Sequence, residues 1–171
     1  MDDRQFDRVY AIMQASFPNI ERRTYEGQKA LLANPHYRLF AESDGEGDAI
    51  GFIASWEFAD FRFVEHFAVD PAIRGGGVGG RLMSGYLARS PKPVILEVEP
   101  PETEPTRRRV GFYERLGFRL NGYDYLQPPL QPGLPDLPLK IMSYPEPLSE
   151  PEFSTFRDTL YERVYRVSRD L

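Results

Sequence analysis

A glycine-rich stretch between an expected strand and an expected helix is the feature that most constrains this chain. Residues 63–70 (FVEHFAVD) are rich in aromatic and β-branched side chains, which is typical of a strand. RGGGVGG follows at residues 74–80, and apolar residues then recur at helical spacing from Leu82 to Leu87. Glycines in such a turn permit positive φ angles, and the first turn of a helix presents unpaired N–H groups. The stretch therefore predicts a binding site for a phosphate or pyrophosphate.

Three kinds of phosphate loop compete for this stretch. A P-loop is excluded, because it ends in Gly-Lys followed by Ser or Thr, whereas this loop ends in Gly-Arg-Leu. The dinucleotide fingerprint G-x-G-x-x-G matches at Gly75, Gly77 and Gly80, and the acidic residues Glu97 and Glu99 follow it. Against this fingerprint, four residues lie between the strand and the glycines, and the rest of the chain lacks repeated βαβ units.

The third interpretation is a resemblance to the GCN5-related N-acetyltransferases, the GNAT superfamily. Their acyl-CoA loop has the pattern Gln/Arg-x-x-Gly-x-Gly/Ala, and Arg74, Gly77 and Gly79 fill its fixed positions. FYERLGF at residues 112–118 is similar to their second signature, a helix that carries Tyr and ends in Gly-Phe. The two signatures occur in the family's order, with an expected strand at residues 94–99 between them.

The resemblance implies the GNAT fold, an α/β fold of the mixed α+β type. Its central sheet is mostly antiparallel, with one parallel crossover at the CoA loop, and a C-terminal helix is added here. The residue pattern predicts helices over residues 3–17, 21–33, 103–116 and from 149 onward, and strands over residues 37–43, 49–58, 63–70, 94–99, 118–126 and 137–144. We expect an acetyltransferase domain over 1–147, and an amphipathic helix over 148–171 that packs on this domain or on a dimer partner.

The composition bounds the class of protein. The chain has 171 residues, enough for one domain, and 41% of them are hydrophobic, which supports a core. The net charge of −5 makes nucleic acid an unexpected partner, and no apolar run is long enough to cross a membrane. The absence of cysteine excludes disulfides, a Cys-ligated metal and a Cys nucleophile, and the two isolated histidines predict no metal site. The polar N-terminal sequence is unlike a signal peptide, so a cytoplasmic protein is expected.

The resemblance implies acetyl-CoA as the cosubstrate, held by the loop and by the backbone of the preceding strand. The loop supplies N–H groups for the pyrophosphate, and the strand pairs with the pantetheine arm. The residues implied in cofactor binding are Phe67, Ala68, Val69, Arg74, Gly75, Gly76, Gly77, Val78, Gly79, Gly80 and Tyr113. Gly76 departs from the family, which often has a longer basic residue there, so one side-chain contact with phosphate is expected to be missing.

Acetyl transfer to an amine also needs a base and an acid. Carboxylates are rare in strands, yet Glu97 lies between apolar residues in one expected strand. Glu65 lies in another expected strand, at a position where the resemblance implies a carboxylate. Leu-Glu-Val at residues 96–98 resembles the segment of ribosomal-protein alanine acetyltransferases in which the Glu is the base. Strand alternation places Glu65 on one face with Phe67 and Val69. Either glutamate could be the base, and the sequence does not decide between them.

The resemblance places Tyr113 near the sulfur atom of the cofactor, as the acid that protonates the leaving thiolate. The ordinary pKa of tyrosine, about 10, is compatible with this role. A core aromatic is the alternative interpretation of Tyr113. His66, on the opposite face from Glu65 by alternation, is expected to be structural, and Glu99 is expected to shape the acceptor pocket.

The sequence thus predicts an N-acetyltransferase that moves an acetyl group from acetyl-CoA to a primary amine by direct attack. The acceptor is a small-molecule amine or a peptide N-terminus, and its identity stays open, as does a homodimer. Two alternatives stay open as well: a CoA-binding sensor or interaction module without turnover, and a dinucleotide-binding protein. The basic run Arg107–Arg109 is either a solvated helix face or a contact with CoA or an acidic acceptor.

Overall fold

The computed structural model describes residues 1–73 and 75–167. The predicted cofactor contact Arg74 therefore lies outside the described residues. The chain divides into two compact units, Met1–Lys92 and Pro93–Leu171.

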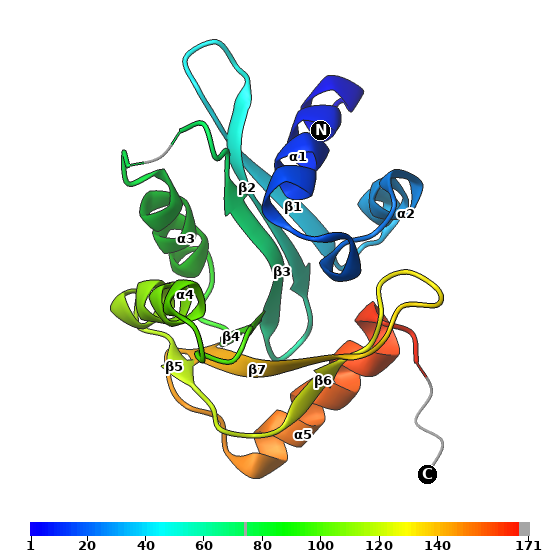
Figure 1. The fold of residues 1–171 in the computed structure, drawn as a ribbon, viewed down its shortest axis with the longest axis vertical. Coiled ribbons are helices and arrows are strands. Elements are labelled where there is room, and N and C mark those ends of the chain that lie inside the picture. The colour runs from blue at the N-terminus through cyan, green and yellow to red at the C-terminus, as the bar shows by residue number, and fades with distance from the viewer. Residues whose placement is uncertain (74, 168–171) are drawn as a thin grey trace. The chain divides into compact units, whose positions relative to one another are not determined.

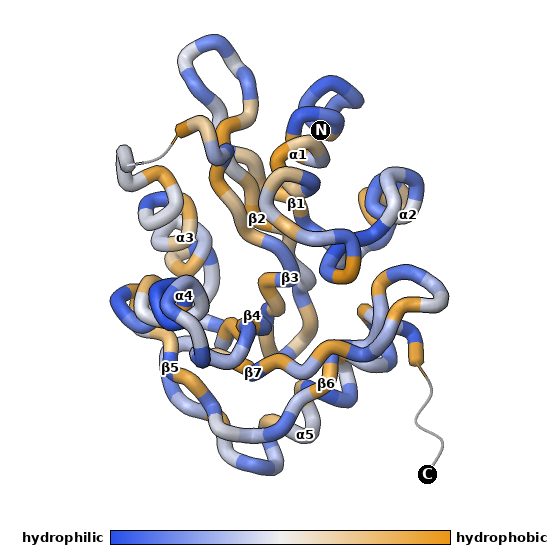
Figure 2. The backbone as a smooth tube through the Cα atoms, viewed as in Figure 1, coloured by the Kyte–Doolittle hydropathy of each residue, from blue (hydrophilic) through white to orange (hydrophobic). Residues whose placement is uncertain are grey.

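The first unit is built on three antiparallel strands (Figure 1). β1 (Tyr37–Ser43) pairs with β2 (Ala49–Glu57), and β2 pairs with β3 (Arg62–Val69). These strands agree with the sequence prediction to within one residue at each end. Figure 2 shows hydrophobic residues along the strands and a hydrophilic tip on the β1–β2 hairpin, as expected for a hairpin that is anchored in a core.

Helices cover both faces of these strands (Figure 1). α1 (Asp3–Ser16) lies on one face, followed by α2 (Tyr25–Ala30), and α3 (Val78–Ala88) lies on the other. The expected single helix over residues 21–33 is wrong: α2 is flanked by 3-10 turns at Asn19–Glu21 and Leu31–Ala33. Thr24 explains the interruption, because its extended backbone and side-chain oxygen cap the start of α2.

A β-bulge interrupts β3 and overturns the strict alternation expected there. Ala54 of β2 pairs with His66, but the next residue, Ser55, pairs with Val64, so Glu65 is the extra residue. The bulge moves Glu65 to the face that carries His66. Phe67 and Val69 lie on the α3 side, because they pair with Ile53 and Gly51, which share a face of β2 with Ser55, and Ser55 contacts Tyr86 of α3. The prediction that Glu65 shares a face with Phe67 and opposes His66 is therefore wrong.

Arg62, the first residue of β3, holds the C-terminal end of α3. The residue is 1% exposed, and its guanidinium group donates to the carbonyl oxygens of Tyr86 at 2.9 Å, Ser90 at 2.9 Å and Lys92 at 3.1 Å. A cation at a helix C-terminus donates to carbonyl oxygens that have no partner within the helix, and it interacts favourably with the negative end of the helix dipole. This contact fixes the helix whose other end carries the glycine loop.

The second unit is built around β7 (Leu137–Tyr144), which pairs antiparallel with β4 (Val94–Val98), β5 (Arg119–Leu120) and β6 (Tyr125–Gln127). The expected continuous strand over residues 118–126 is thus split in two. Asn121 lies at the break. Its amide nitrogen donates to the Ile141 carbonyl at 3.1 Å, and its oxygen accepts from the Leu148 N–H at 2.8 Å.

α4 (Glu104–Arg115) and α5 (Glu150–Thr159) flank these strands (Figure 1). Both helices begin with the predicted N-caps, Thr103 and Ser149, each in a capping box. α5 continues into a π-helical turn, Leu160–Val164. The C-terminal helix packs on its own unit, because the Phe153 ring stacks on Tyr123 at 4.7 Å between centroids. Among the described residues, no helix combines the length and apolarity needed to cross a membrane.

Candidate functional site

The glycine loop ends in an open helix N-terminus. Gly77 is the N-cap of α3, its φ angle is 71°, and no side chain caps the helix. Gly75 also has a positive φ angle, 90°. A Cβ atom added at Gly75 or Gly80 would meet nothing within 4 Å, so the space beside the backbone is open. The first N–H groups of α3, with the positive end of its dipole, are thus suited to an anion.

The other predicted cofactor contacts lie on either side of this open position. Arg81 folds back over the loop, and its guanidinium donates to the Gly76 carbonyl oxygen at 2.5 Å. In β3, Phe67 and Val69 are half-buried and Ala68 is buried, with Phe67 paired to Ile53 of β2. β3, the glycine loop and α3 therefore follow one another within the first unit, as the sequence predicts.

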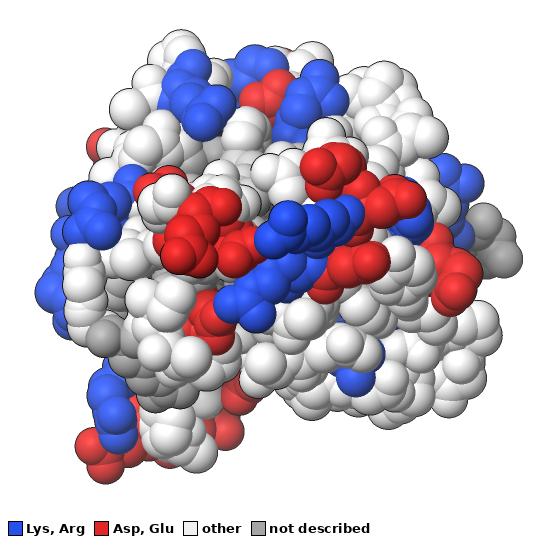
Figure 3. Space-filling model, turned by 90° about the horizontal axis from the view of Figure 1, so that it is seen from above, with Lys and Arg blue, Asp and Glu red and all other residues white. Residues whose placement is uncertain are grey.

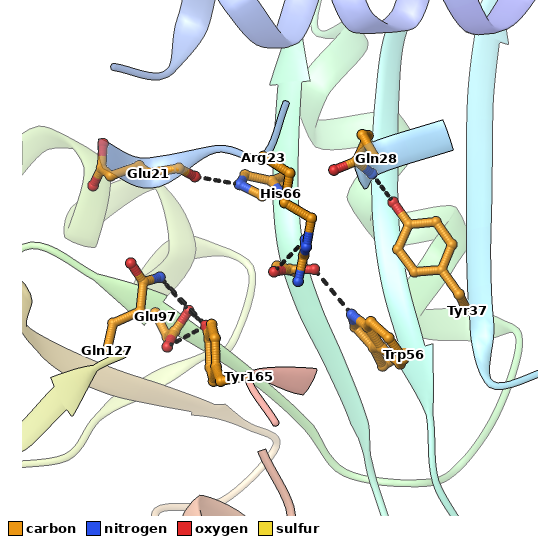
Figure 4. A network of polar contacts seen from close by, with 10 residues as sticks. Glu21, Arg23, Gln28, Tyr37, Trp56, His66, Glu97, Gln127 and Tyr165 are labelled. Carbon is orange, nitrogen blue, oxygen red and sulfur yellow. Dashed lines mark hydrogen bonds and ion pairs between the residues drawn. The ribbon is translucent and has the colours of Figure 1, made fainter. Parts of the chain in front are cut away.

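Glu65, one of the two predicted bases, is enclosed by its own unit. Its side chain is 0% exposed and forms a 2.8 Å ion pair with Arg23, and it accepts a 2.9 Å hydrogen bond from the indole N–H of Trp56 (Figure 4). Burial alone raises the pKa of Glu65, but the charge of Arg23 and the hydrogen bond from Trp56 outweigh it. The pKa therefore lies below its usual value, and the carboxylate stays ionised.

His66 lies beside Glu65 and is 3% exposed. Its Nε2 atom is 2.6 Å from the carbonyl oxygen of Glu21 (Figure 4), and its ring meets Phe17 edge-on at 4.9 Å between centroids. Burial lowers the pKa of His66, and Arg23 lowers it further, although Glu65 and the Glu21 carbonyl act in the opposite direction. The lowered pKa favours the neutral form of the His66 ring in the folded protein. The ring connects the backbone of Glu21 to β3 through a hydrogen bond.

Acid should destabilise the protein through His66. The folded-state pKa lies below the unfolded value of about 6.5, so between the two the unfolded chain binds more protons. The contribution of His66 is complete above pH 6.5 and is lost as the pH falls, by at most about 1.4 kcal/mol for each pH unit. Urea unfolding at pH 7.5 and pH 5.5 should show a larger loss for the natural protein than for His66→Gln. Equal losses in the two proteins would contradict this role of His66. Glu65 does not contribute over this pH range, because its pKa is lowered and its stabilisation is lost only below pH 4.5.

Glu97, the other predicted base, is half-buried and surrounded by hydrogen-bond donors of the second unit (Figure 4). Its Oε1 atom accepts from Gln127 Nε2 at 3.0 Å and from the Tyr165 hydroxyl at 2.7 Å. Its Oε2 atom accepts from the Tyr125 hydroxyl at 2.5 Å, and Tyr165 is 2.9 Å from the same atom. Hydrogen bonds of this kind favour the charged carboxylate and fix its direction.

The strand register explains how these groups meet. Glu97 of β4 lies opposite Ile141 of β7, and Tyr125 of β6 lies opposite Leu139 of β7. Residues directly opposite in antiparallel strands share a face, and positions 139 and 141 share one as well. The carboxylate and the tyrosine are therefore on one face of the sheet, two strands apart.

Tyr113, the predicted acid, lies on α4 and is buried. Its ring packs edge-on against Phe112 at 5.3 Å and Phe118 at 5.6 Å between centroids. Burial raises the pKa of Tyr113 to about 12, and the charge of Arg109 offsets only part of this rise. The hydroxyl therefore stays protonated at physiological pH, as a donor must, but it is a weaker acid than an exposed tyrosine.

Two of the three arginines in the basic run on α4 form ion pairs with acidic neighbours. Arg108 pairs with Glu104 at 3.1 Å, and Arg109 lies 3.9 Å from Glu99, whose side chain is 44% exposed. Basic side chains also lie among acidic ones on the face drawn in Figure 3, which shows no large patch of a single sign.

Sequence reasoning missed the partners of both glutamates. Arg23 and Trp56 hold Glu65, while Tyr125, Gln127 and Tyr165 hold Glu97. The alternation of Tyr125 and Gln127 in one strand was a usable signal, because it puts two donors on one face. Within the described residues, no group of three or more His, Cys, Asp or Glu side chains is placed to hold a metal ion.

Comparisons with known proteins identify the family of this chain. Residues 35–120 match the family model described as the acetyltransferase (GNAT) domain. The Bacillus subtilis (strain 168) protein YjbC is 31% identical over 112 residues, which is 64% of this chain. The match covers 56% of YjbC, so this chain spans little more than half the length of that relative.

Solved structures support the fold assignment. A GNAT-family protein from Bacteroides thetaiotaomicron has a TM-score of 0.88 and 34% identity, over 95% of this chain and 93% of that one. The ribosomal-protein-S18-alanine N-acetyltransferase from Escherichia coli has a TM-score of 0.63 and 19% identity, over 87% of this chain and 92% of that one. The second likeness concerns the fold alone. The fold class expected from the sequence is thus confirmed.

Proposed function

We propose that this chain, which belongs to the GNAT acetyltransferase family, transfers an acetyl group from acetyl-CoA to a primary amine by direct attack. Proteins of this family use acetyl-CoA as the acetyl donor. The observation that carries the proposal is the uncapped N-terminus of α3 behind Gly75 and Gly77, which suits the pyrophosphate. Residues 67–69, at the C-terminal end of β3, are proposed to bind the pantetheine arm through their backbone.

The proposed reaction needs two proton transfers with the protein. Acetyl-CoA supplies the activated thioester carbonyl. A positively charged amine first releases one proton to solvent, its neutral nitrogen then bonds to the carbonyl carbon, and the carbon–sulfur bond breaks. Glu97 takes the proton that the bonded nitrogen gives up, and Tyr113 gives a proton to the departing sulfur. Exchange of one proton through solvent then restores both side chains.

Glu97 is a better candidate for the base than Glu65. Glu97 is half-buried, and three uncharged donors, Tyr125, Gln127 and Tyr165, fix the direction of its carboxylate. Glu65 is fully enclosed, and its charge is matched at 2.8 Å by Arg23. We assign Glu65 a role in positioning the Arg23 segment.

A carboxylate next to the reacting amine favours a positively charged acceptor, which can be a small-molecule amine or a peptide N-terminus. The proposed compartment is the cytoplasm, where acetyl-CoA is available. The proposal makes the cofactor a cosubstrate and requires no metal for either proton transfer.

A thermal-unfolding panel with acetyl-CoA, CoA, NAD and ATP tests the cofactor assignment. At 100 times its Kd, a ligand stabilises the folded state by about 2.7 kcal/mol, and we expect this for acetyl-CoA and CoA. Gly77→Val should abolish the effect, because residue 77 has a positive φ angle and an added Cβ would lie 3.1 Å from Arg81. Gly45→Val is the matched control, since a Cβ there meets nothing within 4 Å.

Turnover is then measured as thiol release in a screen of amines. Stabilisation by NAD alone would contradict the proposal in favour of the dinucleotide fingerprint. Stabilisation by CoA without turnover of any amine, in the natural protein, would favour a sensor or interaction module.

A further inference from the structure

The C-terminal end of the described chain reaches the proposed base. The Tyr165 hydroxyl lies 2.7 Å from one carboxylate oxygen of Glu97 and 2.9 Å from the other (Figure 4). Gln127 connects to both, at 3.0 Å from Glu97 and 3.3 Å from Tyr165. Tyr165 is 9% exposed, so the contact is shielded from solvent. A shielded charge-assisted hydrogen bond is worth more than an exposed one.

The backbone around Tyr165 is unusual on both sides. Before it, the helix widens into the π-helical turn Leu160–Val164, and the Tyr165 N–H donates to the Leu160 carbonyl at 3.0 Å. After it, Arg166 has a φ angle of 54°, the only positive value on a non-glycine residue in the described chain. Both features cost free energy in an ordinary helix end and occur often at functional sites. They place Tyr165 at the end of the helix, with its hydroxyl on Glu97.

We propose that Tyr165 is a positioning residue that keeps Glu97 ionised and directed, so that the C-terminal segment completes the site. This inference rests on the proposed role of Glu97. Both oxygens of the charged carboxylate can accept a hydrogen bond from the phenolic hydroxyl. In the protonated carboxyl one oxygen carries the proton and is a poorer acceptor, so the hydroxyl stabilises the charged form more than the neutral form. Loss of the hydroxyl thus removes stabilisation from the charged form and leaves the carboxylate free to turn.

Tyr165→Phe tests this role, with Tyr161→Phe as the matched control. Both changes remove one hydroxyl from the same segment, but the Tyr161 hydroxyl donates to the Leu126 carbonyl at 2.5 Å. The side-chain carboxyl carbons are followed by NMR in protein labelled with 13C-glutamate, and Glu97→Gln assigns the signal of Glu97. We expect the titration midpoint of Glu97 to move upward by about one pH unit in Tyr165→Phe, the equivalent of one charge-assisted hydrogen bond. It should not move in Tyr161→Phe.

A second measurement uses the natural protein and does not depend on the folding of a variant. A hydroxyl proton held between Tyr165 and Glu97 should exchange slowly with water and give an NMR cross-peak to the Tyr165 ring, which Glu97→Gln removes. Once the screen has identified an amine that the protein acetylates, the pH dependence of kcat provides a further check. In Tyr165→Phe the rise of kcat on the acidic side should shift to higher pH together with the NMR midpoint, and the KM for acetyl-CoA should not change.

The outcomes separate this inference from the proposed function. Equal midpoints in both tyrosine variants, or no protected hydroxyl proton, would overturn the role of Tyr165 while leaving Glu97 as the base. Full activity of Glu97→Gln would overturn the proposed base, whatever the NMR titration shows.

Discussion

Replacing Arg23 with methionine should destabilise the folded protein by about 3–5 kcal/mol, the usual cost of removing one partner from a buried ion pair. Methionine keeps the apolar stem of Arg23 but removes the charge. Glu65, with a side chain that is 0% exposed, would keep only the Trp56 hydrogen bond among its described partners. A whole domain is stabilised by about 5–15 kcal/mol, so this loss is a large share of the total. Urea unfolding at pH 7.5 measures it directly.

Two further variants isolate the cause. Arg4→Met removes the same charge from an ion pair with Asp48, in which the arginine side chain is 83% exposed, and should cost far less. The double change Arg23→Met with Glu65→Gln should recover much of the loss, because no uncompensated charge remains. If Arg23→Met costs no more than Arg4→Met, the 2.8 Å pair does not stabilise the fold.

Glu97→Gln should lower kcat by about 10²–10⁴-fold, the usual contribution of a general base. Glutamine keeps the size of the side chain but does not accept the amine proton at neutral pH. Acetyl-CoA affinity should be unchanged, because Glu97 is not among the proposed cofactor contacts. The measurement is kcat for whichever amine the screen identifies, together with the Kd for acetyl-CoA.

Glu104→Gln is the matched control for this prediction. It makes the same chemical change at the start of α4, on a side chain that is 75% exposed and 3.1 Å from Arg108. It should alter kcat by much less than Glu97→Gln does. Loss of activity in Glu65→Gln, with none in Glu97→Gln, would move the base assignment to Glu65.

The sequence could predict the elements because their signals are local. The helix starts at Thr103 and Ser149 and the strand–loop–helix around Gly77 depend on neighbours within four residues, and the structure has all three. The loop signature also led to the family, and thereby to the fold class. Position along the chain was therefore enough to name the two glutamates and Tyr113 as candidates.

The surroundings of those candidates could not be predicted in the same way. The partners of Glu97 come from positions 28, 30 and 68 residues further along the chain, and a contact of that kind needs the register of β7. The face of Glu65 could not be predicted for a different reason. One extra residue in β3 places Glu65 on the face of His66, and the sequence pattern of that strand carries no sign of the bulge.

The bulge at Glu65 has a consequence for comparing or redesigning this strand. Residues 62–64 and residues 66–69 obey the same two-residue period, but with opposite phase. A deletion of residue 65 would rejoin the phases and leave Val64 and His66 on their present faces, opposite Ser55 and Ala54. A segment taken from a regular strand therefore fits across this position only when it is one residue shorter than the stretch it replaces.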